Sequence, residues 1–138
     1  MSVVSFLRFA RALPGLYPAL AFAYAARVTV RGASMYATLR PGDRILFDAL
    51  AYTEEAPQVG DIVLALHSAR PGVRFIKRVA ALPGEIAGDA VLPPGEYWLL
   101  GDNPDGSTDS RELGPFRRED ITARAWLVYW PPDRAQRL

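Results

Sequence analysis

The sequence predicts a mainly β domain built from short antiparallel strands, with an apolar N-terminal segment before it. Beyond residue 26, short runs rich in Val, Ile, Leu, Phe, Tyr and Trp alternate with turns rich in Pro and Gly, a pattern typical of β proteins. No segment of that part carries an extended helical repeat of apolar residues. The 138 residues, 50% of them hydrophobic, are enough for one compact domain with its own core.

The N-terminal segment, residues 1–26, is basic and apolar. No Asp or Glu occurs before Asp43. Residues 12–26 carry no charge, but as a helix they would reach only about 22 Å, short of a hydrocarbon core of about 30 Å. Adding the preceding residues supplies the missing length, with Arg8 and Arg11 able to reach lipid headgroups. We therefore expect a membrane anchor that spans the bilayer or lies at its surface. A cleaved secretory signal and an apolar arm packed on the domain's own core are the alternatives.

The remaining domain, residues 27–138, contains six runs that predict strands. A loop of suitable length and composition for a hairpin, SARPG at 68–72, joins the third run to the fourth. The expected strands cover residues 27–31, 43–50, 61–67, 73–82, 96–102 and 121–130.

Composition limits the chemistry that the domain can perform. The net charge of +1 argues against a surface built mainly to bind nucleic acid. The absence of cysteine excludes thiolate catalysis and zinc-thiolate sites, and the single histidine, His67, is too little for an ordinary histidine metal cluster. We expect no metal and no cofactor.

Lys77 is the only lysine in a chain with fifteen arginines. In the strand expected at 73–82, alternation places Lys77 on the face of Phe75 and Val79, while Arg74 and Arg78 lie on the other face. Burial among apolar side chains lowers the pKa of an amine, whereas a guanidinium stays protonated. On this ground alone, Lys77 is either a general base or a lysine that extends from a sheet edge into solvent.

Ser34 is the candidate nucleophile for such a base. It follows Gly32 just after the first expected strand and precedes a Pro-Gly turn. A serine in this setting can have an exposed hydroxyl and free backbone N–H groups nearby, which suits attack on a carbonyl and stabilisation of the resulting oxyanion. Taken alone, it could equally be an ordinary turn serine.

Three ordered motifs resemble those of the signal peptidase I family, membrane-bound serine endopeptidases. They are GASMYATLRPGD at 32–43, RFIKRVAALPGE at 74–85 and GDNPDGSTDSRELGPF at 101–116. The resemblance implies a mainly β serine-lysine peptidase, anchored in the cytoplasmic membrane with its catalytic domain outside. It also implies exported precursor proteins as substrates, with small residues one and three positions before the cut.

Carried over residue by residue, the family's nucleophile falls on Ser34, whose backbone N–H is an oxyanion donor, and its general base falls on Lys77. The third motif supplies Ser107, whose hydroxyl is expected to orient the lysine. By analogy, Met35, Tyr36 and the ILF sequence at 45–47 are expected to line the substrate pockets. The resemblance also assigns supporting roles in the scaffold to Asp102, Asn103, Asp109, Arg111 and Gly114.

The chain departs from the family pattern at several points. Ala37 stands where the family usually has proline, and Gly32 stands where some relatives have a second oxyanion donor. The stretch between LPGE and GDN is short, whereas many signal peptidases carry a large additional β domain there. Small relatives include nickel superoxide dismutase maturation proteases, so a protease dedicated to one precursor is an alternative. A self-cleaving repressor peptidase and a non-catalytic β domain are two further alternatives.

Overall fold

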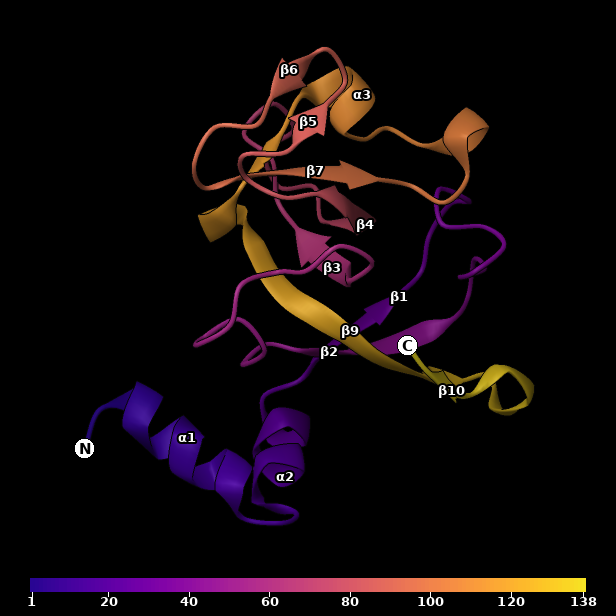
Figure 1. The fold of residues 1–138 in the computed structure, drawn as a ribbon. Coiled ribbons are helices and arrows are strands. Elements are labelled where there is room, and N and C mark those ends of the chain that lie inside the picture. Colours follow the sequence, from indigo (N-terminus) through magenta and orange to yellow (C-terminus); the bar gives the residue numbers. More distant parts are fainter.

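The computed structural model describes all 138 residues and has a curled antiparallel sheet as its main element (Figure 1). Its strands follow the order β1-β2-β9-β3-β4-β7-β8, and β10 also pairs with β9. The prediction of a mainly β fold is confirmed. The six principal strands are β1 (Ala26–Thr29), β2 (Arg44–Asp48), β3 (Ile62–Ala65), β4 (Phe75–Ala81), β7 (Glu96–Leu100) and β9 (Ile121–Trp130).

The six principal strands coincide with the six expected runs, with most ends shorter by a few residues. Four strands of two residues each were not expected, because so short a segment shows no alternation of side chains. The short elements are β5 (Ile86–Ala87), β6 (Ala90–Val91), β8 (Phe116–Arg117), β10 (Gln136–Arg137) and the one-turn helix α3 (Ser110–Leu113).

The long strand β9 joins two hydrophobic cores. It pairs with β2 on one side and with β3 on the other, so its buried residues contribute to both ends of the sheet. The first core lies around Phe47 and Val128 and includes Met35 and Leu39 from the turn after β1. The second core lies around Phe116 and the apolar residues of β4 and β7. The turn that carries Ser34 is therefore fixed by packing on both sides of that residue.

Strands β3 and β4 form the expected hairpin, with Val63 opposite Lys77. Burial alternates along β4, so Phe75, Lys77 and Val79 face inward while Arg78 is only partly covered. The side chain of Lys77 therefore points to the apolar face, as the alternation predicted. The other edge of β4 is unpaired as far as Lys77 and pairs with β7 only from Arg78 onward.

The N-terminal segment forms two helices, α1 (Val3–Ala12) and α2 (Leu16–Ala23), at one end of the molecule (Figure 1). Helix α1 ends before Leu13, whose backbone is extended because Pro14 follows it, and α2 starts after Gly15, which has φ +82°. The break divides the apolar stretch that we expected to act as one segment. None of the helices is long and apolar enough to cross a membrane.

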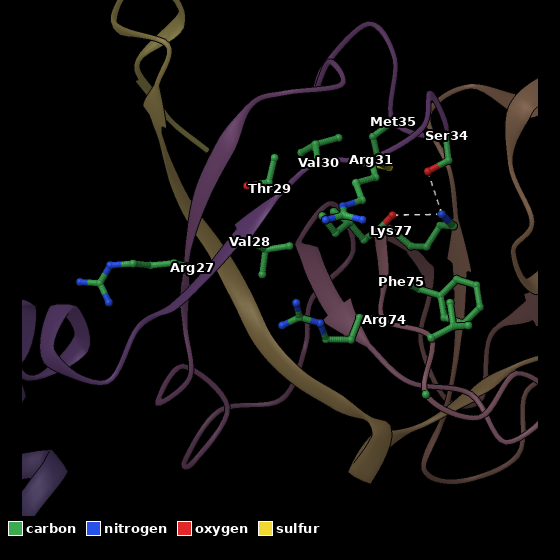
Figure 2. Close-up of a pocket in the computed structure, with 13 residues that line it drawn as sticks. Arg27, Val28, Thr29, Val30, Arg31, Ser34, Met35, Arg74, Phe75 and Lys77 are labelled. Atoms are coloured by element: carbon green, nitrogen blue, oxygen red, sulfur yellow. Dashed lines mark hydrogen bonds between the residues drawn. The ribbon is translucent and has the colours of Figure 1, made fainter.

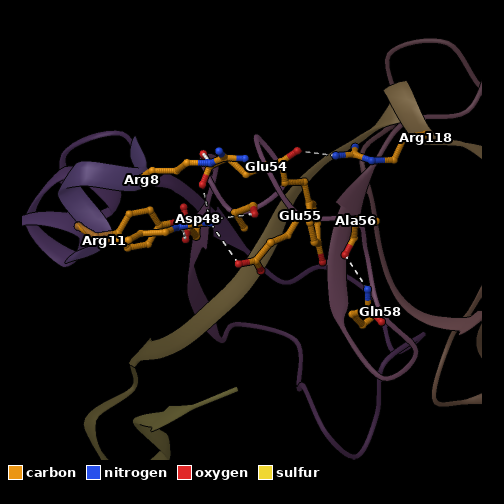
Figure 3. A network of polar contacts seen from close by, with 11 residues as sticks. Arg8, Arg11, Asp48, Glu54, Glu55, Ala56, Gln58 and Arg118 are labelled. Atoms are coloured by element: carbon orange, nitrogen blue, oxygen red, sulfur yellow. Dashed lines mark hydrogen bonds and ion pairs between the residues drawn. The ribbon is translucent and has the colours of Figure 1, made fainter. Parts of the chain in front are cut away.

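Polar contacts attach this helix pair to the domain (Figure 3). Arg8 and Arg11 bind the two carboxylate oxygens of Glu54 at 3.0 and 3.1 Å, and Arg11 also lies 3.1 Å from Glu55. The hydroxyl of Tyr17 donates to Asp48 at 2.8 Å. The basic residues of α1 therefore face acidic residues of the domain.

Candidate active site

Ser34 and Lys77, which are 43 residues apart in sequence, meet at one end of a surface cleft (Figure 2). The turn after β1 presents Ser34, and the middle of β4 presents Lys77. Their Oγ and Nζ atoms are 2.9 Å apart, within hydrogen-bond distance. The amine also donates to the carbonyl oxygen of Ile76 at 3.1 Å. The two residues are thus placed for direct proton transfer.

The surroundings of Lys77 favour its neutral form. The residue is 4% exposed, and burial lowers its pKa below the usual 10.5. The negative charge of Asp109 opposes this by raising the pKa. Burial is the larger of the two effects, so the direction is downward. A lysine whose pKa is lowered can accept a proton from a neighbouring hydroxyl.

The third motif holds the backbone on either side of the nucleophile. The N–H of Asn103 donates to the carbonyl oxygen of Ser34 at 2.9 Å, and the amide group of its side chain donates to Ala33 at 3.0 Å. The N–H of Ser34 itself donates to no other group in the structure. It is therefore free to donate to a group that approaches the Ser34 hydroxyl.

Asp109 is the buried centre of the third motif. It is fully buried and accepts hydrogen bonds from the N–H of Gly101 at 2.9 Å and from the guanidinium of Arg111 at 2.7 and 3.0 Å. Despite burial, which acts in the opposite direction, these hydrogen bonds hold the pKa of Asp109 well below its usual range. Its neighbour Ser110 accepts a hydrogen bond from the N–H of Leu99 at 2.9 Å. The loop is thus tied to β7.

A second ion pair joins the third motif to the lysine strand. Arg78, next to Lys77, donates to both oxygens of Asp102 at 2.9 and 2.8 Å. The pairing with Arg78 lowers the pKa of Asp102. This two-point contact fixes the start of the loop against β4.

Ser107 is partly buried, and its enclosed hydroxyl oxygen makes no hydrogen bond of good geometry, although it lies close enough to the Asp109 carboxylate to help lower the pKa of that group. The Lys77 amine donates to Ser34 and Ile76 instead, so the expected hydrogen bond between Ser107 and Lys77 is not present. The orienting role of Ser107 stays a prediction. An unpartnered buried hydroxyl beside a reactive pair is nonetheless an unusual feature.

Gly101 occupies a position that the sequence did not single out. A Cβ atom there would overlap the side chain of Ser107 and lie 2.6 Å from the carbonyl oxygen of Ser34. Only a residue without a side chain fits between these two groups. Its place at the head of the third motif was the one signal in the sequence.

A further ion pair that sequence reasoning missed braces the turn after Ser34. Arg134, near the C-terminus, donates to both oxygens of the buried Asp43 at 2.9 and 2.8 Å, and this pairing lowers the pKa of Asp43. Asp43 also accepts from the N–H of Arg40 at 2.9 Å. No local pattern links residues 91 positions apart.

The cleft that starts at Ser34 and Lys77 has a volume of about 690 Å³ and runs between β1 and residues 72–77 (Figure 2). The N–H of Val30 donates to the carbonyl oxygen of Asp43, and the carbonyl oxygen of Val30 accepts from the N–H of Gly42. Because backbone groups of successive residues in extended chain point to opposite edges, those of Arg31 point toward the cleft. Met35 lines the cleft, as expected. Tyr36 does not, and residues 45–47 are buried, with Ile45 and Phe47 packed in the first core. The pocket assignment for the ILF sequence is therefore wrong.

No group of three or more His, Asp or Glu side chains is placed to hold a metal ion. His67 lies with its Nε2 atom 3.1 Å from the carbonyl oxygen of Pro115 and its ring against Phe116. It packs within the domain, away from the residues that line the cleft.

Comparison with known proteins gives one consistent result. Residues 4–88 and 85–130 match the family described as "Signal peptidase, peptidase S26". The chain is similar to mitochondrial inner membrane protease subunit 1 of Xenopus tropicalis, with 36% identity over 80% of this chain and 73% of the relative. It is 35% identical to subunit 2 of the Mus musculus protease, over 79% and 69%. It is 33% identical to signal peptidase I of Leptolyngbya laminosa, over 73% and 66%.

Proposed function

The chain belongs to the signal peptidase family, peptidase S26, and from this premise we propose that it is a serine endopeptidase with Ser34 as nucleophile and Lys77 as general base. Membership of the family confirms the resemblance inferred from the three motifs. One observation carries the assignment of roles: the 2.9 Å contact between the hydroxyl of Ser34 and the buried amine of Lys77. An amine in such surroundings can be neutral when the substrate binds.

In the proposed reaction, the lone pair of Lys77 Nζ takes the proton of Ser34 Oγ as this oxygen attacks the scissile carbonyl carbon. The oxyanion that forms is stabilised by the backbone N–H of Ser34. Collapse of the intermediate breaks the C–N bond, and the Lys77 ammonium gives its proton to the departing amine. Water then attacks the acyl-enzyme, again losing a proton to Lys77. Release of the acid restores the Ser34 hydroxyl.

Ser107 completes this arrangement as a positioning residue. A neutral lysine has two N–H groups and one lone pair. When the lone pair accepts from Ser34, one N–H can donate to Ile76, as in the structure, and the other is free for the unpartnered oxygen of Ser107. The hydrogen bonds to Ile76 and Ser107 would then aim the lone pair at Ser34.

The substrate in this proposal is the N-terminal part of an exported precursor protein, bound as an extended strand in the cleft. The outward backbone groups of Arg31 and the unpaired edge of residues 72–77 offer hydrogen bonds to a chain lying between them. Small residues one and three positions before the cut are expected from the family resemblance. They would fit beside Met35, close to Ser34.

Residues 1–26 are proposed to hold the enzyme at the cytoplasmic membrane, with residues 27–138 as the peptidase domain on the extracytoplasmic side. Phe6 and Phe9 lie at helical spacing on α1 and are 39% and 54% exposed, and Leu13, just after the helix, is 41% exposed. Phe22 of α2 is also exposed, at 53%. Large apolar side chains gathered on one helix pair suit the boundary between lipid headgroups and acyl chains.

Cleavage of a soluble peptide with alanine one and three positions before the cut tests the catalytic assignment. Ser34→Ala is expected to abolish cleavage, with a loss of about 10⁶-fold in kcat. Ser68→Ala, in the exposed loop between β3 and β4, is the matched control and should cleave as the wild type does. Thermal unfolding of both variants shows whether the fold is kept. A folded Ser34→Ala variant that cleaves at the wild-type rate contradicts the proposal.

A further inference from the structure

The cleft beside Ser34 and Lys77 is basic and contains no acidic residue. Of the residues that line it, Arg27, Arg31 and Arg74 carry a guanidinium and none carries a carboxylate. None of these three arginines takes part in an ion pair within the protein. Seven other arginines of the chain do so. The cleft therefore holds positive charge that the protein itself leaves unneutralised.

Arg31 and Arg74 have matching positions on the two walls of the cleft. Arg31 lies three residues before Ser34, and Arg74 lies three residues before Lys77. Residues 74–77 run extended into β4, so Arg74 lies about 10 Å along the chain from Lys77, whereas Arg31 is joined to Ser34 through the turn at Gly32, where φ is +73°. Figure 2 shows both side chains lying in the region between the two walls, whereas the side chain of Arg27 extends away toward the helices, where its guanidinium lies 5.4 Å from the ring centre of Phe22. Two cationic groups are thus available in the cleft beside the reacting atoms.

We propose that Arg31 and Arg74 select precursors with an acidic side chain two or four residues before the scissile bond, at the positions that the small residues expected one and three before it leave open. An extended substrate advances by about 3.3 Å per residue and points alternate side chains to opposite sides, so residues a few places from the cut can turn toward the arginines while the small ones turn toward Met35. Guanidinium groups bind carboxylates through paired N–H donors. This inference rests on the proposed peptidase function and specifies its substrate class.

Peptide cleavage in the absence of lipid tests the preference. The parent peptide is uncharged near the cut, and a set of variants places one aspartate at each position from four before to four after the scissile bond. We expect kcat/KM to rise about three- to tenfold when the aspartate lies two or four residues before the cut, and this rise to shrink as salt is added.

Substitution of the two arginines is the decisive part of the test. Arg31→Gln with Arg74→Gln should remove the gain from aspartate, so that the ratio of kcat/KM for the aspartate peptide to kcat/KM for the uncharged parent peptide falls to about one. Arg44→Gln is the matched control, because Arg44 is exposed and lacks an ion pair but lies outside the cleft, against Trp130. It should keep the full preference.

The outcomes separate this inference from the proposed function. No gain at any position, or a gain that survives in the double variant, overturns the inference while cleavage of the parent peptide leaves the peptidase function intact. Loss of parent cleavage in Ser34→Ala is the separate test of that function. If the double variant keeps the aspartate preference but binds anionic vesicles more weakly than Arg44→Gln, the arginines serve lipid headgroups and the inference is also overturned.

Discussion

The two sides of the Ser34–Lys77 pair use arginine in opposite ways. Behind the pair, Arg78, Arg111 and Arg134 each bind a carboxylate through two hydrogen bonds and fix a loop. In front of it, Arg31 and Arg74 line the cleft without any carboxylate. A guanidinium with a partner in the protein stabilises the site, whereas one without a partner is available to a ligand. Substitutions behind the pair should therefore affect every substrate, and those in front only some.

The lysine at the centre of this comparison should give the largest effect. Lys77→Arg keeps the charge but cannot supply a neutral base, so kcat/KM should fall by about 10²- to 10⁴-fold or more. Lys77→Met should be equally inactive but more stable, by about 0.5–2 kcal/mol, because it removes a buried charge. The stabilisation should shrink as the pH rises toward 10.5, where the unfolded lysine also loses its proton.

Cleavage rates together with thermal unfolding at several pH values measure both effects. A Lys77→Arg variant that cleaves at the wild-type rate would show that the general base is another group. A Lys77→Met variant less stable than the wild type at neutral pH would show that the ammonium stabilises the fold.

The close packing behind the pair is tested at Gly101. Gly101→Ala would push a methyl group against Ser107 and the Ser34 carbonyl, which should cost about 1–3 kcal/mol of stability and slow cleavage of all peptides alike. Gly106→Ala is the graded comparison: its methyl group would meet the side chain of Asn103, which donates to Ala33, rather than backbone, so a smaller effect is expected. Gly101→Ala enzyme with unchanged melting temperature and kcat would show that the loop behind the pair is not closely packed.

The charge behind the pair should act on the lysine over distance. Asp109 raises the pKa of Lys77, so Asp109→Asn should lower it and move the acid limb of the kcat/KM profile to lower pH. The lowered pKa of Asp109 itself contributes stability above its usual range, near pH 4, which is lost as the pH falls through the lowered value. Asp109→Asn should therefore lose less stability on acidification.

The exposed Asp89→Asn is the control for both measurements. If the acid limb of Asp109→Asn moves to higher pH, or does not move at all, Asp109 does not influence the base in the way that the geometry indicates.

The apolar face of the helix pair should have the smallest effect on the chemistry, since it lies outside the cleft. Phe6→Ser with Phe9→Ser should weaken binding to lipid vesicles and leave cleavage of a soluble peptide within about twofold. Vesicle sedimentation and peptide cleavage give the two values. Unchanged vesicle binding would favour the alternative that α1 and α2 are only an arm of the domain.

Much of this architecture could be predicted from local patterns. The apolar runs located all six principal strands, and alternation placed Lys77 on the buried face, because a strand of seven or more residues shows its period in the sequence. The break after α1 was also visible as Pro14 and Gly15, but the sequence did not show that two helices would dock through Arg8 and Arg11.

Contacts between distant segments could not be predicted. The pairing of Asp43 with Arg134, and of Arg78 with Asp102, depends on how the sheet curls rather than on any local period. For the same reason the ILF sequence was misplaced: the apolar character of Phe47 fits a substrate pocket as well as a core, and only its packing against residues from distant segments decides for the core. The ion pairs could not be predicted because their partners are far apart in sequence, and core and cleft residues could not be told apart because both are apolar.

The claim that Lys77 can be a neutral base is most directly tested by its own titration. Because Lys77 is the only lysine, isotopic labelling of lysine gives a single side-chain NMR signal that can be followed against pH in the intact protein. The account predicts a midpoint below 10.5, since burial outweighs the attraction of Asp109. A midpoint at or above 10.5 in the folded protein would contradict it.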